Sequence, residues 1–201
     1  MGRVSLSERD KKIGSLNQRT LFGKTKKTVT RTFRISAEWD NFLRKEAESQ
    51  GISVNVLMNL ILRRHAHVYI LAQADNLLCL TKTTFRKIIE GISLEYLGRT
   101  GSDTSSKDFP NILGMLGLPS DYDSFAYLVS RYFGCPNGAM WFCCHRHTQK
   151  NTDIFHLQHN LGRKWSVFLR EFFLFYLKTL NIKGEAKVYD NAVNIKVLRP
   201  S

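Results

Sequence analysis

Few cysteines and no long apolar run restrict what this 201-residue chain can be. Its four cysteines are too few for the disulfide framework of a small secreted protein. Charged residues interrupt even the most apolar stretch, at 167–180, so no run reaches the roughly 20 residues of a membrane span. The N-terminus is too polar for a secretory signal peptide. We therefore expect a soluble cytoplasmic protein with no membrane partner.

The sequence also lacks the patterns that many enzymes share. It has no glycine-rich loop that would hold phosphates, because Gly114 and Gly117 stand in an apolar helical context. No serine or cysteine nucleophile stands beside a base in a recognisable arrangement. We therefore expect no enzymatic activity, and an enzyme attached to a binding module is the least favoured of the hypotheses below.

Positive charge is abundant and gathers at the N-terminal end. The chain has 30 Lys and Arg against 17 Asp and Glu, a formal net charge of +13. Residues 1–36 contain ten Lys or Arg and two acids, which is +8 in under a fifth of the chain. Such a cluster attracts polyanions. We expect residues 1–25 to form a flexible basic arm, and Lys26 and Lys27 to follow DNA phosphates.

The segment from Lys26 to about residue 66 predicts one strand followed by two helices. Ser36 suits the N-cap of the first helix, Gly51 suits the position after its end, and Ser53 suits the cap of the second. The second helix is apolar nearly all round, which indicates burial on every side. The strand at 28–35 alternates, with Arg31 as an exception; its apolar face has Val29, Phe33 and Ile35, and its polar face has Thr28, Thr30, Thr32 and Arg34.

No second strand lies nearby in the sequence to pair with this one. An unpaired strand leaves backbone donors and acceptors open, and a folded protein must satisfy them. A short segment also cannot bury an all-apolar helix alone. A second copy of the same chain would meet both needs, so we expect a homodimer.

The order strand, Ser36 cap, helix, 51–53 turn and apolar helix resembles the ribbon-helix-helix family of DNA-binding proteins, the Arc/MetJ type. The resemblance covers about a fifth of the chain. In that family two chains pair their strands antiparallel, and the resulting ribbon enters the DNA major groove. The resemblance implies base contacts from Thr30, Thr32 and Arg34 and phosphate contacts at the start of the second helix, from Ser53, Val54 and Asn55. Arg31 departs from the family pattern, and we expect it at the ribbon's end, reaching for the DNA backbone.

The remaining chain, 75–201, predicts a second domain, and residues 26–72 form the first. The pattern of residues 75–201 indicates the α+β class, with helices on one face of a mostly antiparallel sheet. The first elements expected are a helix with its apolar face at 85–92, closed by Gly98, a mobile polar loop at 99–108 and a short helix at 111–118. They are followed by a helix from a Ser120–Asp123 capping box through Phe133, strands at 140–147 and 152–159, a helix at 163–180 and a hairpin at 186–198. We expect this domain to act in ligand sensing or dimerisation.

A group of histidines and a cysteine in this domain is a candidate metal site. Cys143, His145 and His147 share one strand face, and a hairpin centred on residues 150–151 sets His145 opposite His156. A thiolate with imidazoles is a ligand set for zinc, copper or nickel. The alternative is that these residues are partly buried polar groups that line a pocket or a subunit interface.

Three functional hypotheses follow. The first is a homodimeric transcription regulator that binds double-stranded DNA and senses a small-molecule or metal effector, such as zinc or nickel. The second is a DNA-binding interaction protein, for example an antitoxin or a plasmid-partition or relaxation accessory factor, whose C-terminal half binds a protein. The third is an enzyme on a DNA-binding module. The first is favoured because the C-terminal half has the pattern of a folded domain, whereas antitoxin tails are typically short or disordered.

Overall fold

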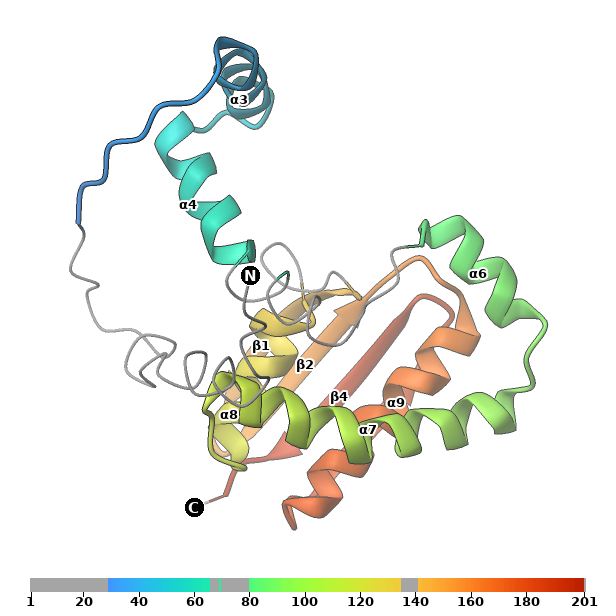
Figure 1. Cartoon of the computed structure of the whole chain (residues 1–201). Helices are drawn as coiled ribbons and strands as arrows, with labels where there is room; N and C mark the ends of the chain where they lie inside the picture. The colour runs from blue at the N-terminus through green and yellow to red at the C-terminus, as the bar shows by residue number, and fades with distance from the viewer. Residues whose placement is uncertain (1–28, 66–68, 70–79, 135–140, 201) are drawn as a thin grey trace, which may run out of the picture. The chain divides into compact units, whose positions relative to one another are not determined.

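The computed structural model describes residues 29–65, 69, 80–134 and 141–200, and these fall into two compact units, one helical and one α+β (Figure 1). The predicted basic arm at 1–25, together with Lys26 and Lys27, lies outside the described residues. Among the described residues, no helix combines the length and the hydropathy that crossing a membrane requires. The predicted α+β class is confirmed by six α-helices and a four-stranded antiparallel sheet in the described chain.

The first unit contains two helices, α3 (Ala37–Ser49) and α4 (Val54–Arg64). Both begin at the serines that the sequence indicated. The Ser36 hydroxyl accepts the Trp39 N–H at 3.4 Å, and the Ser53 hydroxyl accepts the Val56 N–H at 3.2 Å. Each serine satisfies a backbone donor that the first helical turn leaves without a partner.

Gly51 ends α3 in the left-handed conformation, with φ at +64°. The N–H of Ile52 donates to the Ala47 carbonyl at 3.0 Å, and the N–H of Gly51 donates to the Glu48 carbonyl at 3.0 Å. This pair of bonds is the Schellman ending, which favours glycine because a side chain is strained at positive φ. The turn between the helices therefore follows directly from the Gly-Ile-Ser sequence.

Within the described residues, the predicted strand at 28–35 is not formed in the single chain. Residues 29–36 are in neither helix nor strand, and Figure 1 shows an extended segment that precedes α3. A strand exists through the hydrogen bonds of its ladder, and no described segment of the same chain pairs with this one. The alternating pattern alone cannot supply those bonds.

The second unit is a sheet with helices on one face. Its strands pair antiparallel in the order β1-β2-β4-β3. The elements are α6 (Lys82–Glu90), α7 (Leu94–Leu116), α8 (Tyr122–Tyr127) with a following π-helical turn (Leu128–Tyr132), β1 (Cys143–Gln149), β2 (Thr152–Gln158), α9 (Arg163–Thr179), β3 (Gly184–Val188) and β4 (Ala192–Leu198). The two hairpins and the helix between them agree with the predicted ones to within a few residues.

The core lies between the sheet and helices α7 and α9, which cross each other in Figure 1. Phe109 of α7 is fully buried, and its ring stacks on Tyr176 of α9 at 3.9 Å between centroids. The inward residues of β2 and β4 are fully buried; they are Phe155, Leu157, Val193, Ile195 and Val197. The outward residues of the same strands are partly or fully exposed, so the opposite face of the sheet is open in the described chain.

The predicted helix end at Gly98 and the predicted mobile loop at 99–108 are wrong, because α6 already ends at Glu90 and both positions lie inside α7. Gly101 and Ser105 are buried there, and Gly101 faces α9. A Cβ at Gly101 would lie 2.6 Å from the Phe168 carbonyl oxygen, so only glycine permits this close approach. The small residues that suggested a loop are the ones that let two helices pack closely, and the predicted short helix at 111–118 is the last part of the same α7.

The predicted capping box at Ser120 and Asp123 is also wrong. Asp121 caps α8 instead, and its Oδ1 accepts the Ser124 N–H at 2.8 Å. The Ser120 hydroxyl is bonded to the Tyr176 hydroxyl at 3.0 Å. The predicted helix to Phe133 does continue, but as a π-helical turn in which the Phe133 N–H donates to the Leu128 carbonyl.

Candidate functional sites

The predicted base-reading residues lie together in the segment ahead of α3. Thr30, Thr32 and Arg34 are exposed, as is Arg31. In the described part of the chain neither arginine forms an ion pair; the Nη1 of Arg31 donates only to the Thr30 carbonyl, at 3.4 Å. Both guanidinium groups are therefore accessible to an outside acceptor.

The predicted phosphate-binding residues lie in the first turn of α4. Ser53 caps the helix, and Asn55 is tied to Asn59, whose Nδ2 donates to the Asn55 carbonyl at 2.8 Å. Val54 is partly buried. The first backbone N–H groups of a helix have no partner within it, so this turn presents donors at the positive end of the helix dipole.

The helical unit exposes most of its large apolar side chains. Only Ala47 and Leu57 are buried among the described residues 29–65. Trp39 and Phe42 form an edge-to-face pair on the surface of α3, with 6.3 Å between ring centroids. Eight large apolar residues are each at least 42% exposed, namely Val29, Phe33, Ile35, Trp39, Phe42, Val56, Ile61 and Leu62. An exposed apolar set of this kind in so small a unit is typical of an interface.

The hairpin of β1 and β2 has the register that the sequence predicted. His145 pairs with His156, and Cys143 pairs with Gln158. Cys143, His145 and His147 are exposed on the open face of the sheet, and His156 is partly buried. The Nδ1 of His156 is hydrogen-bonded to the amide oxygen of Asn194 on β4.

These four residues do not fit a metal centre within one chain. In the described residues, no three His, Cys, Asp or Glu side chains lie close enough to hold a metal ion. Only His145 and His156 face each other directly, and His156 already has Asn194 as a partner. Cys144 points to the other side of β1, where burial raises the pKa of its thiol to about 11 and makes it a poor metal ligand or nucleophile at neutral pH.

A hydrogen-bonded cluster around one buried aspartate, which the sequence did not reveal, lies on the inner side of the same hairpin. Asp153 is fully buried. Its Oδ2 accepts from the Tyr122 hydroxyl and from Nε and Nη2 of Arg146, with the Nε bond at 3.1 Å. Its Oδ1 accepts from the Thr148 hydroxyl at 2.6 Å. We call these four residues, Tyr122, Arg146, Thr148 and Asp153, the Asp153 cluster.

Hydrogen bonding controls the charges of the Asp153 cluster. Burial by itself would raise the pKa of Asp153, but hydrogen bonds from Thr148, Tyr122 and Arg146 outweigh it and hold that pKa below its usual value. Burial and the bond to Asp153 raise the pKa of Tyr122. The cluster therefore contains a carboxylate, a guanidinium and a neutral phenol at physiological pH. A polar Arg-x-Thr followed by Asp on the inward face of the hairpin was the available sequence signal.

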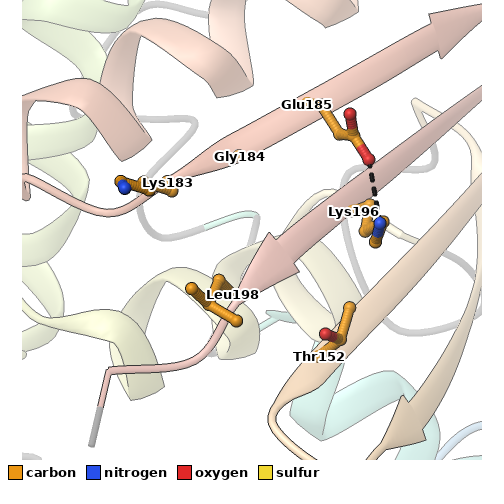
Figure 2. A pocket seen from close by; sticks show the side chains of 6 residues that line it. All are labelled: Thr152, Lys183, Gly184, Glu185, Lys196 and Leu198. Atoms are coloured by element: carbon orange, nitrogen blue, oxygen red, sulfur yellow. Dashed lines mark ion pairs between the residues drawn. The ribbon is translucent and has the colours of Figure 1, made fainter.

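Two shallow hollows adjoin the sheet. One, of about 380 Å³, lies near the end of β4 and is lined by Thr152, Lys183, Gly184, Glu185, Lys196 and Leu198 (Figure 2). Figure 2 shows Lys196 paired with Glu185, at 3.0 Å, and Lys183 apart from them. The other, of about 340 Å³, is lined by Asp121, Tyr122, Asp123, Arg146, Arg199 and Pro200, and so adjoins the Asp153 cluster.

Acid should destabilise the second unit through His159. Its Nε2 is bonded to the Ser166 hydroxyl at 2.9 Å, and its Nδ1 accepts the Leu161 N–H at 3.2 Å. Burial, aided by the positive Lys82, lowers the pKa of His159 to about 4. The unfolded chain takes up this proton near pH 6.5 and the folded chain only near pH 4, so stability is lost as the pH falls through that window.

We expect the melting temperature to fall by on the order of 5 °C between about pH 7 and pH 5, and His159→Gln to flatten this dependence. Thermal melts across the pH range measure it. His145→Gln, on the open face, is the control and should keep the full slope. The same slope in His159→Gln would show that another group is responsible.

Searches against protein-family models, curated proteins and solved structures found no match to this chain.

Proposed function

We propose that this chain is a homodimeric regulator that binds specific sequences of double-stranded DNA. Two copies pair their 28–35 segments as an antiparallel ribbon, which enters the major groove. Thr30, Thr32 and Arg34 contact base edges, while the first turn of α4 contacts a phosphate. The α+β domain binds a small effector.

The exposed apolar surface of the helical unit is the observation that supports this proposal most. Its described part, 29–65, has little apolar core of its own. It buries only two apolar side chains and exposes eight large ones. A second copy that covers Phe33, Trp39 and Leu62 would supply the missing core. Pairing of two 28–35 segments would also supply the ladder bonds that this segment lacks in one chain.

The charge pattern supports DNA as the partner of that dimer. Ten of the chain's 30 Lys and Arg lie in residues 1–36, and a dimer doubles them. Arg34 and Arg31 are exposed and have no acidic partner among the described residues. In such a dimer the basic side chains would attract the DNA phosphates, and the ribbon would place side chains in the major groove, where they contact bases. DNA recognition needs both kinds of contact.

Binding to a selected DNA sequence tests the proposal. We expect Arg34→Ala to lose about 1–3 kcal/mol of binding to the preferred sequence and little on random DNA, because a base contact is specific. Lys26→Ala should weaken binding to both and reduce the slope of log Kd against log salt by about 1. Site selection from a random library, followed by fluorescence anisotropy at several salt concentrations, measures both.

Arg44→Ala is the matched control, since Arg44 is held by Asp40 on α3 at 2.7 Å and has no proposed DNA contact. Equal losses on specific and random DNA for Arg34→Ala would contradict its base contact. A chain that sediments as a monomer while bound to its site would contradict the ribbon. A different protein that copurifies in stoichiometric amounts would favour the interaction-protein hypothesis instead.

A further inference from the structure

The hollow beside the Asp153 cluster brings two arginines and two aspartates to one place. Arg146 comes from β1 and Arg199 from the residue after β4, whereas Asp121 and Asp123 come from the start of α8. Segments far apart in the sequence therefore meet around a space of about 340 Å³. Ligand pockets begin at about this size.

Arg146 is fixed in this hollow with part of its guanidinium unused. Asp153 takes Nε and Nη2, and the ring of Phe155 lies 5.4 Å from the guanidinium carbon. The Arg146 side chain is nevertheless 35% exposed. Arg has five N–H donors, so the two bonds to Asp153 leave further donors for a ligand. Because the buried Asp153 carboxylate binds one side of the Arg146 guanidinium, the exposed side of that group is held in a fixed direction.

Among the described residues, Arg199 is a second cation in the hollow without a carboxylate partner. Its backbone N–H donates to the Asn151 carbonyl at 2.7 Å, and its Nη2 donates to the Lys150 carbonyl. Its Nε is buried and has no acceptor among the described residues. An anionic group in the hollow would lie near both guanidinium groups.

The aspartates add a negative side to the same hollow. Asp121 is committed to capping α8. Asp123 is exposed and forms no ion pair within the described chain. A ligand that was only an anion would meet this carboxylate unfavourably, whereas a ligand with an ammonium group as well would gain from it.

We propose that this hollow binds a small zwitterion of the α-amino acid class. Its carboxylate contacts Arg146 and Arg199, and its ammonium group contacts Asp123. Asp153 positions Arg146 and does not itself touch the ligand. The role of this ligand as the effector rests on the proposed DNA-binding function, but its binding does not.

Calorimetric titration of the full chain with the 20 common α-amino acids tests the site. For the amino acid that binds best, the matched acid without the amino group and the matched amine without the carboxylate should each bind at least about tenfold more weakly. Arg199→Gln and Asp123→Asn should each weaken the binding of the amino acid by a similar factor. Asp123 is exposed, so its variant should fold normally.

Arg163→Gln is the matched control, since Arg163 begins α9, follows the opposite end of β2 and is exposed. It should bind the amino acid as the parent does. The proposal is overturned if no amino acid binds with a Kd below about 10 mM, or if inorganic phosphate binds as tightly as the best amino acid. It is also overturned if Arg163→Gln loses as much affinity for the amino acid as Arg199→Gln does. DNA binding is measured separately. A chain that does not bind DNA can still bind the amino acid, and a chain that does not bind the amino acid can still bind DNA.

Discussion

Gly101→Ala is expected to lower the free energy of unfolding of the α+β domain by about 2–3 kcal/mol. The added Cβ would lie 2.6 Å from the Phe168 carbonyl oxygen and 3.2 Å from the Phe172 nitrogen. Both are backbone atoms of α9, so no side chain can rotate away to make room. The two helices must separate, and the packing around Phe109 between them must loosen. Urea denaturation followed by tryptophan fluorescence measures the change.

Gly114→Ala in the same helix is the matched control. A Cβ at Gly114 meets nothing within 4 Å. Alanine has the higher helix propensity, so this variant should be stabilised by up to about 1 kcal/mol. If the two variants change stability alike, the close approach of α7 and α9 at Gly101 is not what restricts that position.

Asp153→Ala is expected to have a comparable effect, about 3 kcal/mol of destabilisation. The change removes the acceptor of Tyr122, Thr148 and Arg146 at once. Tyr122 is buried and would keep an unsatisfied hydroxyl, whereas Arg146 is partly exposed and can regain water, which limits the loss. Chemical denaturation measures it.

Glu185→Ala provides the comparison for an exposed ion pair. Glu185 and Lys196 lie 3.0 Å apart on the open face of the sheet, and both side chains are more than half exposed. Exposed pairs contribute at most about 1 kcal/mol, so this variant should be nearly neutral. A loss at Asp153 no larger than that at Glu185 would mean that the buried cluster does not hold α8 to the sheet.

The elements that the sequence predicted well depend on short-range chemistry. Ser36, Ser53 and Gly51 act on backbone groups a few residues away, so both ends of α3 and the start of α4 can be predicted without knowledge of the rest of the fold. The register that sets His145 opposite His156 follows from a two-residue turn and the alternation of strand residues. Each of these features is determined within about ten residues.

The elements that were missed depend on residues far away in the chain. Gly101 and Ser105 resemble loop residues until α9 packs against them. Arg146 and Asp153 are ordinary surface residue types until the hairpin turns them inward beneath Tyr122. Arg199 reaches the same hollow from the end of the chain. Apart from the polar residues on the inward face of the hairpin, these encounters leave no local pattern in the sequence.

By itself, the amino-acid sequence determined the ends of α3, the start of α4, the hairpin register, the α+β class and the concentration of positive charge near the N-terminus, because each follows from local hydrogen bonds, side-chain alternation or composition. Only the tertiary structure decided which face of the sheet is covered, where α7 meets α9 and which charged groups share a hollow. It also left the 28–35 segment without a ladder in one chain, since the hydrogen bonds of a strand require a neighbour that no described residue of the same chain provides.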